Sequence, residues 1–409
     1  ITILQAKITR QKGRENYEKI NGVNLGNWLV LEKWMCPALF DGTTAEDEYY
    51  LAHQLSPQMF EMRLKLHRSE YITERDFAHI AHMGMNSVRI PIPYFIFGDR
   101  PPFLGCIQEL DKAFNWAEKY GLSILLDLHT VPMSQNGFDN GGISGVCKWS
   151  QMPEEVEFVL GVLERLAQRY GARKGLLGIE PLNEPLTGGA WEVFDISNRY
   201  PPVDQELAKG SAPITLEFLR DFYTKAYDRM RKHMDADKYV VFHDGFQLHA
   251  WKDFFQSGNF RNVILDTHQY LMMAESMGCE QTQEGYLSYI REHYAKEIAQ
   301  VQEYVDVICG EWSLFNSLVV GVDTKGGQSV LNGMDFSQQD NRLSEANRKQ
   351  LYRSIAQAEL DAWNQGSGHY YWNYKLLLDP TNDPNWYGWD CWDLGKSVSE
   401  GWFPVPSET

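Results

Sequence analysis

Two glutamates end short apolar segments of the chain, and each has a neighbour that suits sugar chemistry. Glu184 closes residues 178–184 directly after Asn183, and Glu311 follows the apolar run 307–310. Cleavage of a glycosidic bond by a retaining enzyme needs two carboxyl groups about 5–5.5 Å apart, one as acid and base and one as nucleophile. We therefore expect Glu184 to be the acid/base and Glu311 the nucleophile, with the Asn183 amide holding a sugar hydroxyl. This cycle requires a protonated Glu184 beside an ionised Glu311, so we expect their pKa values to be pushed apart.

Glu180 is a competing carboxylate in the same segment. Side chains alternate along a strand, so Glu180, Leu182 and Glu184 are expected to face one side. We favour Glu184 because it lies nearest the end of the predicted strand. An isolated Asn-Glu-Pro also fits a helix cap or an ion pair, so the prediction depends on both glutamates together.

Polar and aromatic residues also occur in or after other apolar runs. Arg89 lies within one of them, and a buried cation needs a partner; it fits either a structural ion pair or a group that keeps the nucleophile ionised. His129, His268 and Tyr270 end two further runs, where a histidine is equally compatible with a structural role. Trp372 fits either a floor under a sugar ring or packing inside the fold.

Other chemistries have weaker support in the sequence. His129, His268 and the two glutamates are possible metal ligands, but no HxH pair or HExxH motif is present. There is no Gly-x-Ser-x-Gly motif of a serine hydrolase, and the glycine-containing turn at 22–28 lacks the GxGxxG spacing of dinucleotide sites. We expect neither a metal nor another cofactor.

Short β-type segments alternate with longer amphipathic ones along the chain. Strands are predicted at 20–25, 86–94, 123–130, 176–185, 239–246, 263–270, 305–313 and 368–375. Helices are predicted at 69–82, 154–169, 215–234, 284–303 and 344–364, with Thr73, Pro153 and Ser344 as start signals. This order predicts the α/β class and a (β/α)8 TIM barrel over residues 1–409 as a single domain, with an open doubly wound sheet as the alternative.

Three long segments follow predicted strands, at 187–212, 272–283 and 321–342. In a barrel such segments lie at the carboxyl-end face, where active sites form, so we expect extended loops that wall the site; a decorative insertion is the alternative. The first contains three aromatic residues, and a second wall is expected after the third strand. The residues concerned are Trp191, Phe194 and Tyr200, and Phe138, Asp139 and Asn140. A groove closed in this way admits only the end of a sugar chain.

Composition narrows the class of partner. The net charge of −17 argues against nucleic acid and anionic membranes, and no apolar run reaches the roughly 18 residues of a bilayer span. Aromatic residues make up 13% of the chain, which fits either a large core or sugar stacking. The six cysteines form no CxxC pair. The chain has no Asn-x-Ser/Thr site, which favours a cytoplasmic location, while the start at Ile1 leaves a removed signal peptide and secretion open. The oligomeric state is not predicted.

Several motifs together resemble glycoside hydrolase family 5, and in particular its exo-β-1,3-glucanase-like branch. They cover nearly the whole chain, at 22–32, 86–92, 125–129, 134–140, 183–185, 268–270, 310–313 and 400–404. The resemblance implies a retaining β-glycosidase that binds β-1,3-glucan or a related β-glucoside. It implies a pocket of Glu32, His129, Asp139, Asn140, Asn183, Tyr270 and Trp372, supported by Arg89 and His268.

Two segments depart from that branch, at 129–135 and 187–212, so the resemblance does not predict the leaving group. Two other functions remain as alternatives. One is an inactive carbohydrate-binding barrel, which the presence of both glutamates disfavours. The other is an endo-acting cellulase or mannanase, which needs an open cleft.

Overall fold

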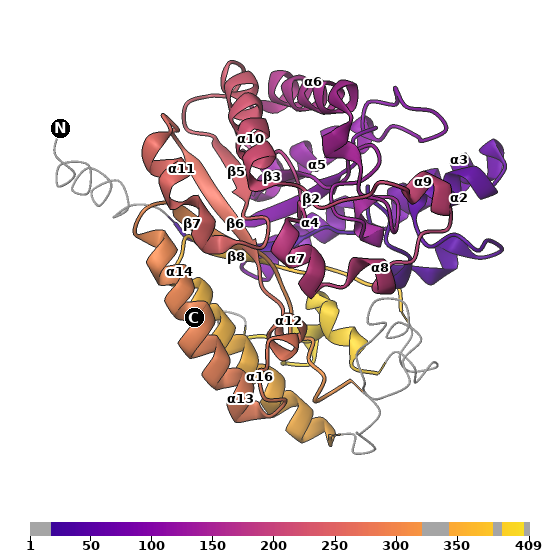
Figure 1. The fold of residues 1–409 in the computed structure, drawn as a ribbon. Coiled ribbons are helices and arrows are strands. Elements are labelled where there is room, and N and C mark those ends of the chain that lie inside the picture. Colours follow the sequence, from indigo (N-terminus) through magenta and orange to yellow (C-terminus); the bar gives the residue numbers. More distant parts are fainter. Residues whose placement is uncertain (1–17, 321–342, 379–386, 405–409) are drawn as a thin grey trace.

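Eight parallel strands form a closed barrel in the computed structural model, which describes residues 18–320, 343–378 and 387–404 (Figure 1). Each strand pairs with the next along the chain, and β8 pairs with β1. The strands are β1 Ile20–Asn24, β2 Ser87–Ile92, β3 Ser123–Leu128, β4 Leu176–Glu180, β5 Tyr239–His243, β6 Val263–His268, β7 Asp306–Trp312 and β8 Gly368–Tyr371. The predicted (β/α)8 barrel and all eight strand positions are confirmed, although every strand ends earlier than predicted.

The longer helices cover the outside of the barrel (Figure 1). The helices before β5 are α2 Glu48–Gln54, α3 Pro57–Glu70, α4 Glu74–His82, α5 Ile107–Tyr120, α6 Pro153–Tyr170, α7 Gly188–Val193, α8 Ile196–Arg199, α9 Gln205–Ala208 and α10 Leu216–Arg231. Those after β5 are α11 Lys252–Ser257, α12 Leu271–Ser276, α13 Gln283–Tyr289, α14 Ala295–Gln302, α16 Glu345–Trp363 and α17 Leu394–Ser399. Because helices cover the strands from outside and side chains fill the interior, strands such as β2 are buried at every position.

Three predicted helix boundaries need correction. The range predicted as one helix, 69–82, contains the end of α3 and the whole of α4. Thr73 forms a capping box with Asp76, so a new helix begins after it. The helix predicted at 284–303 contains a π-helical stretch, Ile290–Tyr294, between α13 and α14. Pro153 is the first residue of α6 and not its cap, which suits a residue without a backbone N–H.

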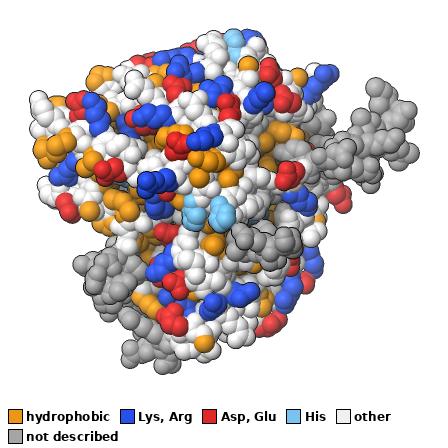
Figure 2. Space-filling view, turned by 180° about the vertical axis from the view of Figure 1, so that it is seen from behind, with side chains coloured by type: hydrophobic (Ala, Val, Ile, Leu, Met, Phe, Trp, Pro, Cys, Tyr) orange, Lys and Arg blue, Asp and Glu red, His pale blue; other side chains and the backbone are white. Residues whose placement is uncertain are grey.

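The long segments do lie after strands, but they are not irregular throughout. Residues 187–212 contain α7, α8 and α9, and α12 covers the start of 272–283. The third segment, 321–342, lies outside the described residues, and the single-domain assignment of 1–409 stays a prediction. Among the described helices, none combines the length and apolar character that a bilayer span requires. On the face turned away from Figure 1, acidic and basic side chains are interspersed, so opposite charges offset one another there (Figure 2).

Candidate active site

Glu184 lies four residues beyond β4 and not within it. The strand ends at Glu180, and Glu184 adopts a left-handed backbone with φ of 43°. Side-chain alternation along a strand therefore does not extend to Glu184. The expectation that Glu180 and Glu184 face one side because they share a strand is wrong. Gln135 fixes the turn instead: its Nε2 donates to the carbonyls of Asn183 and His129, both at 2.8 Å. Sequence reasoning did not assign this positioning role to Gln135.

Glu311 lies within β7, and the glycine before it has a steric purpose. Gly310 donates its backbone N–H to Asp266 Oδ1 at 2.6 Å. A Cβ at Gly310 would lie 2.0 Å from Asp266 Oδ2, closer than two such atoms can approach. The missing side chain thus lets the Asp266 carboxylate pack against β7 beside the nucleophile candidate.

Arg89 connects the two glutamates' surroundings from beneath the pocket. Its guanidinium donates to Glu311 Oε1 at 2.8 Å, to Asn183 Oδ1 at 2.8 Å and to Glu180 Oε2 at 2.9 Å. It also lies 3.1 Å from Asp127 Oδ2 and is completely buried. A buried charge with this many partners both orients Asn183 and occupies Glu180, which leaves Glu184 as the carboxylate exposed to the pocket.

His268 lies between the two candidate catalytic carboxylates. Its Nδ1 is 2.8 Å from Glu184 Oε1 and 3.5 Å from Glu311 Oε2. Glu184 Oε1 and Glu311 Oε2 can therefore be no further apart than these two distances added together. This limit is below the roughly 6.5 Å at which the carboxyl separation of inverting enzymes begins. Tyr270 donates its hydroxyl to Glu311 Oε2 at 2.8 Å, and Asn140 donates to Glu184 Oε2 at 2.9 Å.

The pKa directions differ from the expected order. Burial raises the pKa of Glu184, but hydrogen bonding and charge from His268, with the Asn140 hydrogen bond, more than offset it, so the net shift is downward. Burial raises the pKa of Glu311, and the lowering by His268 and Arg89 is not enough to reverse this. Burial lowers the pKa of His268, yet Glu311 and Asp266 bring it well above its ordinary value. These directions favour a protonated His268 next to an ionised Glu184. Arg89 lowers the pKa of Glu311 as expected, but less than His268 does.

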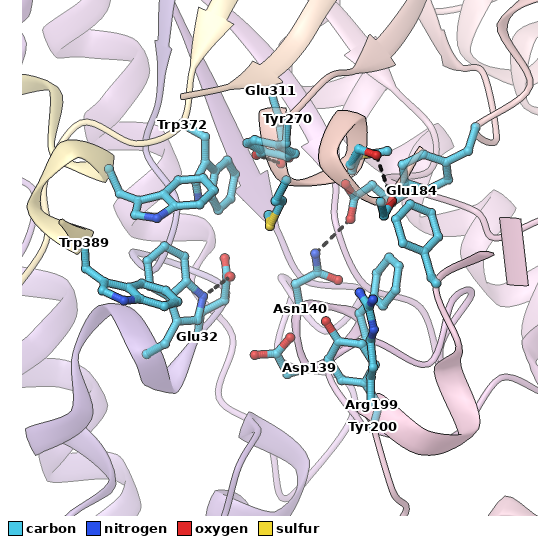
Figure 3. Close-up of a pocket in the computed structure, with 18 residues that line it drawn as sticks. Glu32, Asp139, Asn140, Glu184, Arg199, Tyr200, Tyr270, Glu311, Trp372 and Trp389 are labelled. Atoms are coloured by element: carbon cyan, nitrogen blue, oxygen red, sulfur yellow. Dashed lines mark hydrogen bonds between the residues drawn. The ribbon is translucent and has the colours of Figure 1, made fainter. Parts of the chain in front are cut away.

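Most of the predicted site residues line one pocket at the carboxyl-end face (Figure 3). These are Glu32, Phe138, Asp139, Asn140, Glu184, Tyr270, Glu311 and Trp372. The other four, Arg89, His129, Asn183 and His268, are buried behind it. His129 stacks on Trp372 with 5.7 Å between ring centroids, and Asp127 Oδ2 lies 2.6 Å from its Nδ1, so it supports the pocket wall from behind.

The surroundings of two acidic side chains in the pocket, Glu32 and Asp139, favour their protonated forms. Burial, followed by the charge of Asp139, raises the pKa of Glu32 well above its ordinary value, although Trp34 Nε1 donates to its Oε2 at 2.9 Å. Burial likewise raises the pKa of Asp139 to about 6. Such carboxyl groups can donate as well as accept hydrogen bonds with sugar hydroxyls.

The pocket also contains residues that the sequence prediction did not assign to it. They are Trp34, Arg199, Phe246, Met272, Met273, Ser276, Trp389 and Trp392. Phe194 and Tyr200 line the pocket as expected of the 187–212 segment, whereas Trp191 packs in the apolar cluster behind it. The tryptophans at 389 and 392 follow β8, so only the rule that segments after strands face the site would have indicated them.

Two groups of possible metal ligands occur among the described residues. They are Glu184, His243 and His268, and Glu180, Asp266 and His268, with ligand atoms within 4.8 Å of one another. Within these groups Glu180 pairs with Arg89, Asp266 accepts from Gly310, and His268 pairs with Glu184. Most of the set is thus engaged in hydrogen bonds, and the expected independence from metal stays a prediction.

Known proteins resemble this chain in sequence and in fold. Residues 50–347 match the family model described as Cellulase (glycosyl hydrolase family 5). A probable glucan 1,3-beta-glucosidase A of Emericella nidulans is 33% identical over 95% of this chain and 91% of its own length. A glucan 1,3-beta-glucosidase of Kluyveromyces lactis is 32% identical over 96% of this chain and 90% of its own length.

A solved structure supports the fold assignment. The rutinosidase from Aspergillus niger superposes with a TM-score of 0.69 at 21% identity, covering 94% of this chain and 98% of that structure. At this identity the likeness concerns the barrel alone. The family-model match and the two glucosidase relatives, which extend over most of the chain, identify it as an enzyme that belongs to glycosyl hydrolase family 5.

Proposed function

We propose that this enzyme is a retaining, exo-acting β-glucosidase that acts on β-1,3-linked glucan or a related β-glucoside. The observation that carries the proposal is the placement of Glu184 and Glu311 in one pocket, with His268 Nδ1 2.8 Å from the first and 3.5 Å from the second. The names of the two curated relatives support a glucan with β-1,3 linkages as the substrate.

In the first step, the Glu311 carboxylate attacks the anomeric carbon while Glu184 protonates the departing oxygen. The proton on His268 lies in the hydrogen bond to Glu184, so its transfer across 2.8 Å gives a protonated Glu184 and a neutral imidazole. This transfer reconciles the lowered pKa of Glu184 with its role as an acid. In the second step, Glu184 accepts a proton from water, which hydrolyses the glucosyl ester on Glu311.

The shape of the site supports exo action. The segment 187–212 contributes Phe194, Arg199 and Tyr200 to the pocket lining. It is tied down at its end, where Ala212 N donates to the Cys147 carbonyl at 3.0 Å and Cys147 N donates to Ser211 Oγ at 3.0 Å. A fixed wall on this side favours entry of a chain end over passage of a long chain through an open cleft.

The roles of the two glutamates can be separated with azide as an external nucleophile. Glu184→Ala should lose several orders of magnitude in turnover, yet with an activated aryl β-glucoside azide should restore rate and give the β-glucosyl azide. Glu311→Gly should yield the α-glucosyl azide, because azide then attacks the substrate directly. Normal activity in either variant, or the opposite stereochemistry, would contradict the assignment; circular dichroism confirms that the variants are folded.

The action pattern is tested by brief digestion of a long β-1,3-glucan, followed by size-exclusion chromatography and glucose assay. We expect glucose to accumulate while the polymer size falls slowly. A rapid fall in polymer size with little glucose would show endo cleavage and leave the catalytic pair unaffected. Cellulose and mannan oligosaccharides serve as the comparison substrates.

A further inference from the structure

Arg199 lines the pocket without an acidic partner. It is the last residue of α8, it is half-buried, and it forms no salt bridge with any residue that the structure describes. Its backbone N–H donates to the Asp195 carbonyl at 3.0 Å, and the fully buried Ile196 anchors the same helix. The guanidinium therefore extends from a fixed element, and its donors are not taken up by any residue of the described ranges.

The position of Arg199 relative to the two carboxylates indicates which part of a substrate it meets. Figure 3 shows Arg199 and Tyr200 on the side of Asn140 and Glu184, whereas Trp372, Trp389 and Glu32 lie across the pocket. The acid protonates the oxygen of the leaving group, so the leaving group must lie on the side of Glu184. Arg199 thus belongs to the leaving-group side.

Apolar side chains line the same pocket as Arg199. Phe194 packs edge-to-face against both Phe138 and Phe246, with centroid distances of 5.6 Å and 4.9 Å. Met272 and Met273 of α12 also line the pocket. Together these residues suit a flat, apolar body that carries an acceptor group at its edge.

The position of α12 is fixed by its own polar contacts. Glu275 accepts hydrogen bonds from Tyr286 Oη at 2.6 Å and from Ser317 N at 2.9 Å. The two methionines are therefore presented by an anchored helix.

The remaining charged residues of the pocket lining are acidic, namely Glu32, Asp139, Glu184 and Glu311. Those of them that are ionised would repel an anionic leaving group unless a cation faced it. Arginine is the side chain best suited to a planar anion, because it donates two parallel hydrogen bonds. The charge pattern thus makes Arg199 the determinant of whether an anion is accepted.

We propose that Arg199, with Phe194, Met272 and Met273, forms a leaving-group subsite that selects an aromatic leaving group bearing a carboxylate. The proposal rests on the proposed function, since it assumes that Glu184 protonates the leaving group. It adds a specificity determinant that lies in the 187–212 segment.

The test compares two β-D-glucosides of equal size, 4-carboxyphenyl and 4-carbamoylphenyl, which differ in the charge of one group. For Arg199→Gln we expect kcat/KM for the carboxylate substrate to fall about tenfold and that for the amide less than about twofold. Lys209→Gln is the matched control, because it removes a positive charge from the same segment at a side chain that is 78% exposed. The control should leave the ratio of the two substrates unchanged.

A second measurement separates selection from structural damage. The leaving group of 2,4-dinitrophenyl β-D-glucoside carries no carboxylate, so Arg199→Gln should lose much less kcat/KM on this substrate than on the 4-carboxyphenyl glucoside. Equal losses on both aryl substrates, or no change on either, would overturn the subsite. If the wild type hydrolyses no β-glucoside, the proposed function fails instead. Calorimetric binding of 4-hydroxybenzoate against 4-hydroxybenzamide then tests the subsite alone: tighter binding of the acid that is lost in Arg199→Gln supports it, and equal binding overturns it.

Discussion

One buried imidazole serves both carboxylates of the site. His268 stabilises the ionised form of Glu184 by a hydrogen bond, and its charge also lowers the pKa of Glu311. Its own pKa lies well above the ordinary value of 6.5, chiefly because Glu311 and Asp266 outweigh burial. These shifts favour a proton on His268, next to the group that we propose as the acid.

Replacement of His268 should narrow the pH profile of kcat/KM from both sides. In His268→Gln, Glu184 has to hold the proton alone, so the alkaline limb should move to lower pH. The pKa of Glu311 should rise because a neighbouring positive charge is lost, so the acidic limb should move to higher pH. The measurement is kcat/KM for an aryl β-glucoside across the pH range.

His243→Gln is the control for this experiment. Its ring centroid lies 4.4 Å from that of His268, but burial lowers its pKa well below the ordinary value, which favours a neutral ring without a positive charge to remove. We expect both limbs to stay in place in this variant. A lower maximum with unchanged limbs in His268→Gln would mean that His268 acts only as a structural support.

At the scale of the element, α16 carries an unusual buried acid. Glu359 is completely buried, and neither of its oxygens has a hydrogen-bond partner in the described part of the chain. Burial raises its pKa well above the ordinary value of 4.5. The folded protein therefore binds this proton more tightly than the unfolded chain does, and the stability that it contributes is full below about pH 4.5 and lost as the pH rises toward the folded pKa.

We predict that in Glu359→Gln the free energy of unfolding falls less steeply as the pH rises. In the wild type this one group makes the free energy of unfolding fall by up to about 1.4 kcal/mol per pH unit above the ordinary pKa. Urea denaturation at several pH values gives the slope for each protein. Glu345→Gln, at the exposed start of the same helix, should keep the wild-type slope. Identical slopes in all three proteins would show that Glu359 is not protonated in the folded state.

At the scale of the whole molecule, the barrel is closed without covalent cross-links between cysteines. All six cysteines are described by the structure, and each is buried with a free thiol. We predict that iodoacetamide modifies few or none in the native protein and all six in urea without reductant, as counted by intact-mass spectrometry. Fewer adducts in urea would reveal a disulfide, and adding reductant would then lower the melting temperature.

The order of the eight strands, the closed barrel and the presence of Glu184 and Glu311 in one pocket could be predicted from the sequence alone. Each depends on local patterns, namely apolar periodicity and polar residues at or near the ends of strands, which a single chain displays directly. The catalytic roles of the two glutamates stay predictions. The helix caps Thr73 and Ser344 could be predicted for the same reason. So could the aromatic residues Phe194 and Tyr200, which line the pocket.

The contacts among the charged groups of the site became visible only in three dimensions. The turn that sets Glu184 is fixed by Gln135, which lies 48 residues earlier in the chain than Asn183, and the pKa order follows from His268, 84 residues after Glu184. The role that we propose for Arg199 depends on α8, which carries it to the pocket that Glu184 also lines, without a salt bridge to any described residue. Electrostatic interactions act through space and depend on burial, so spacing along the chain does not predict them.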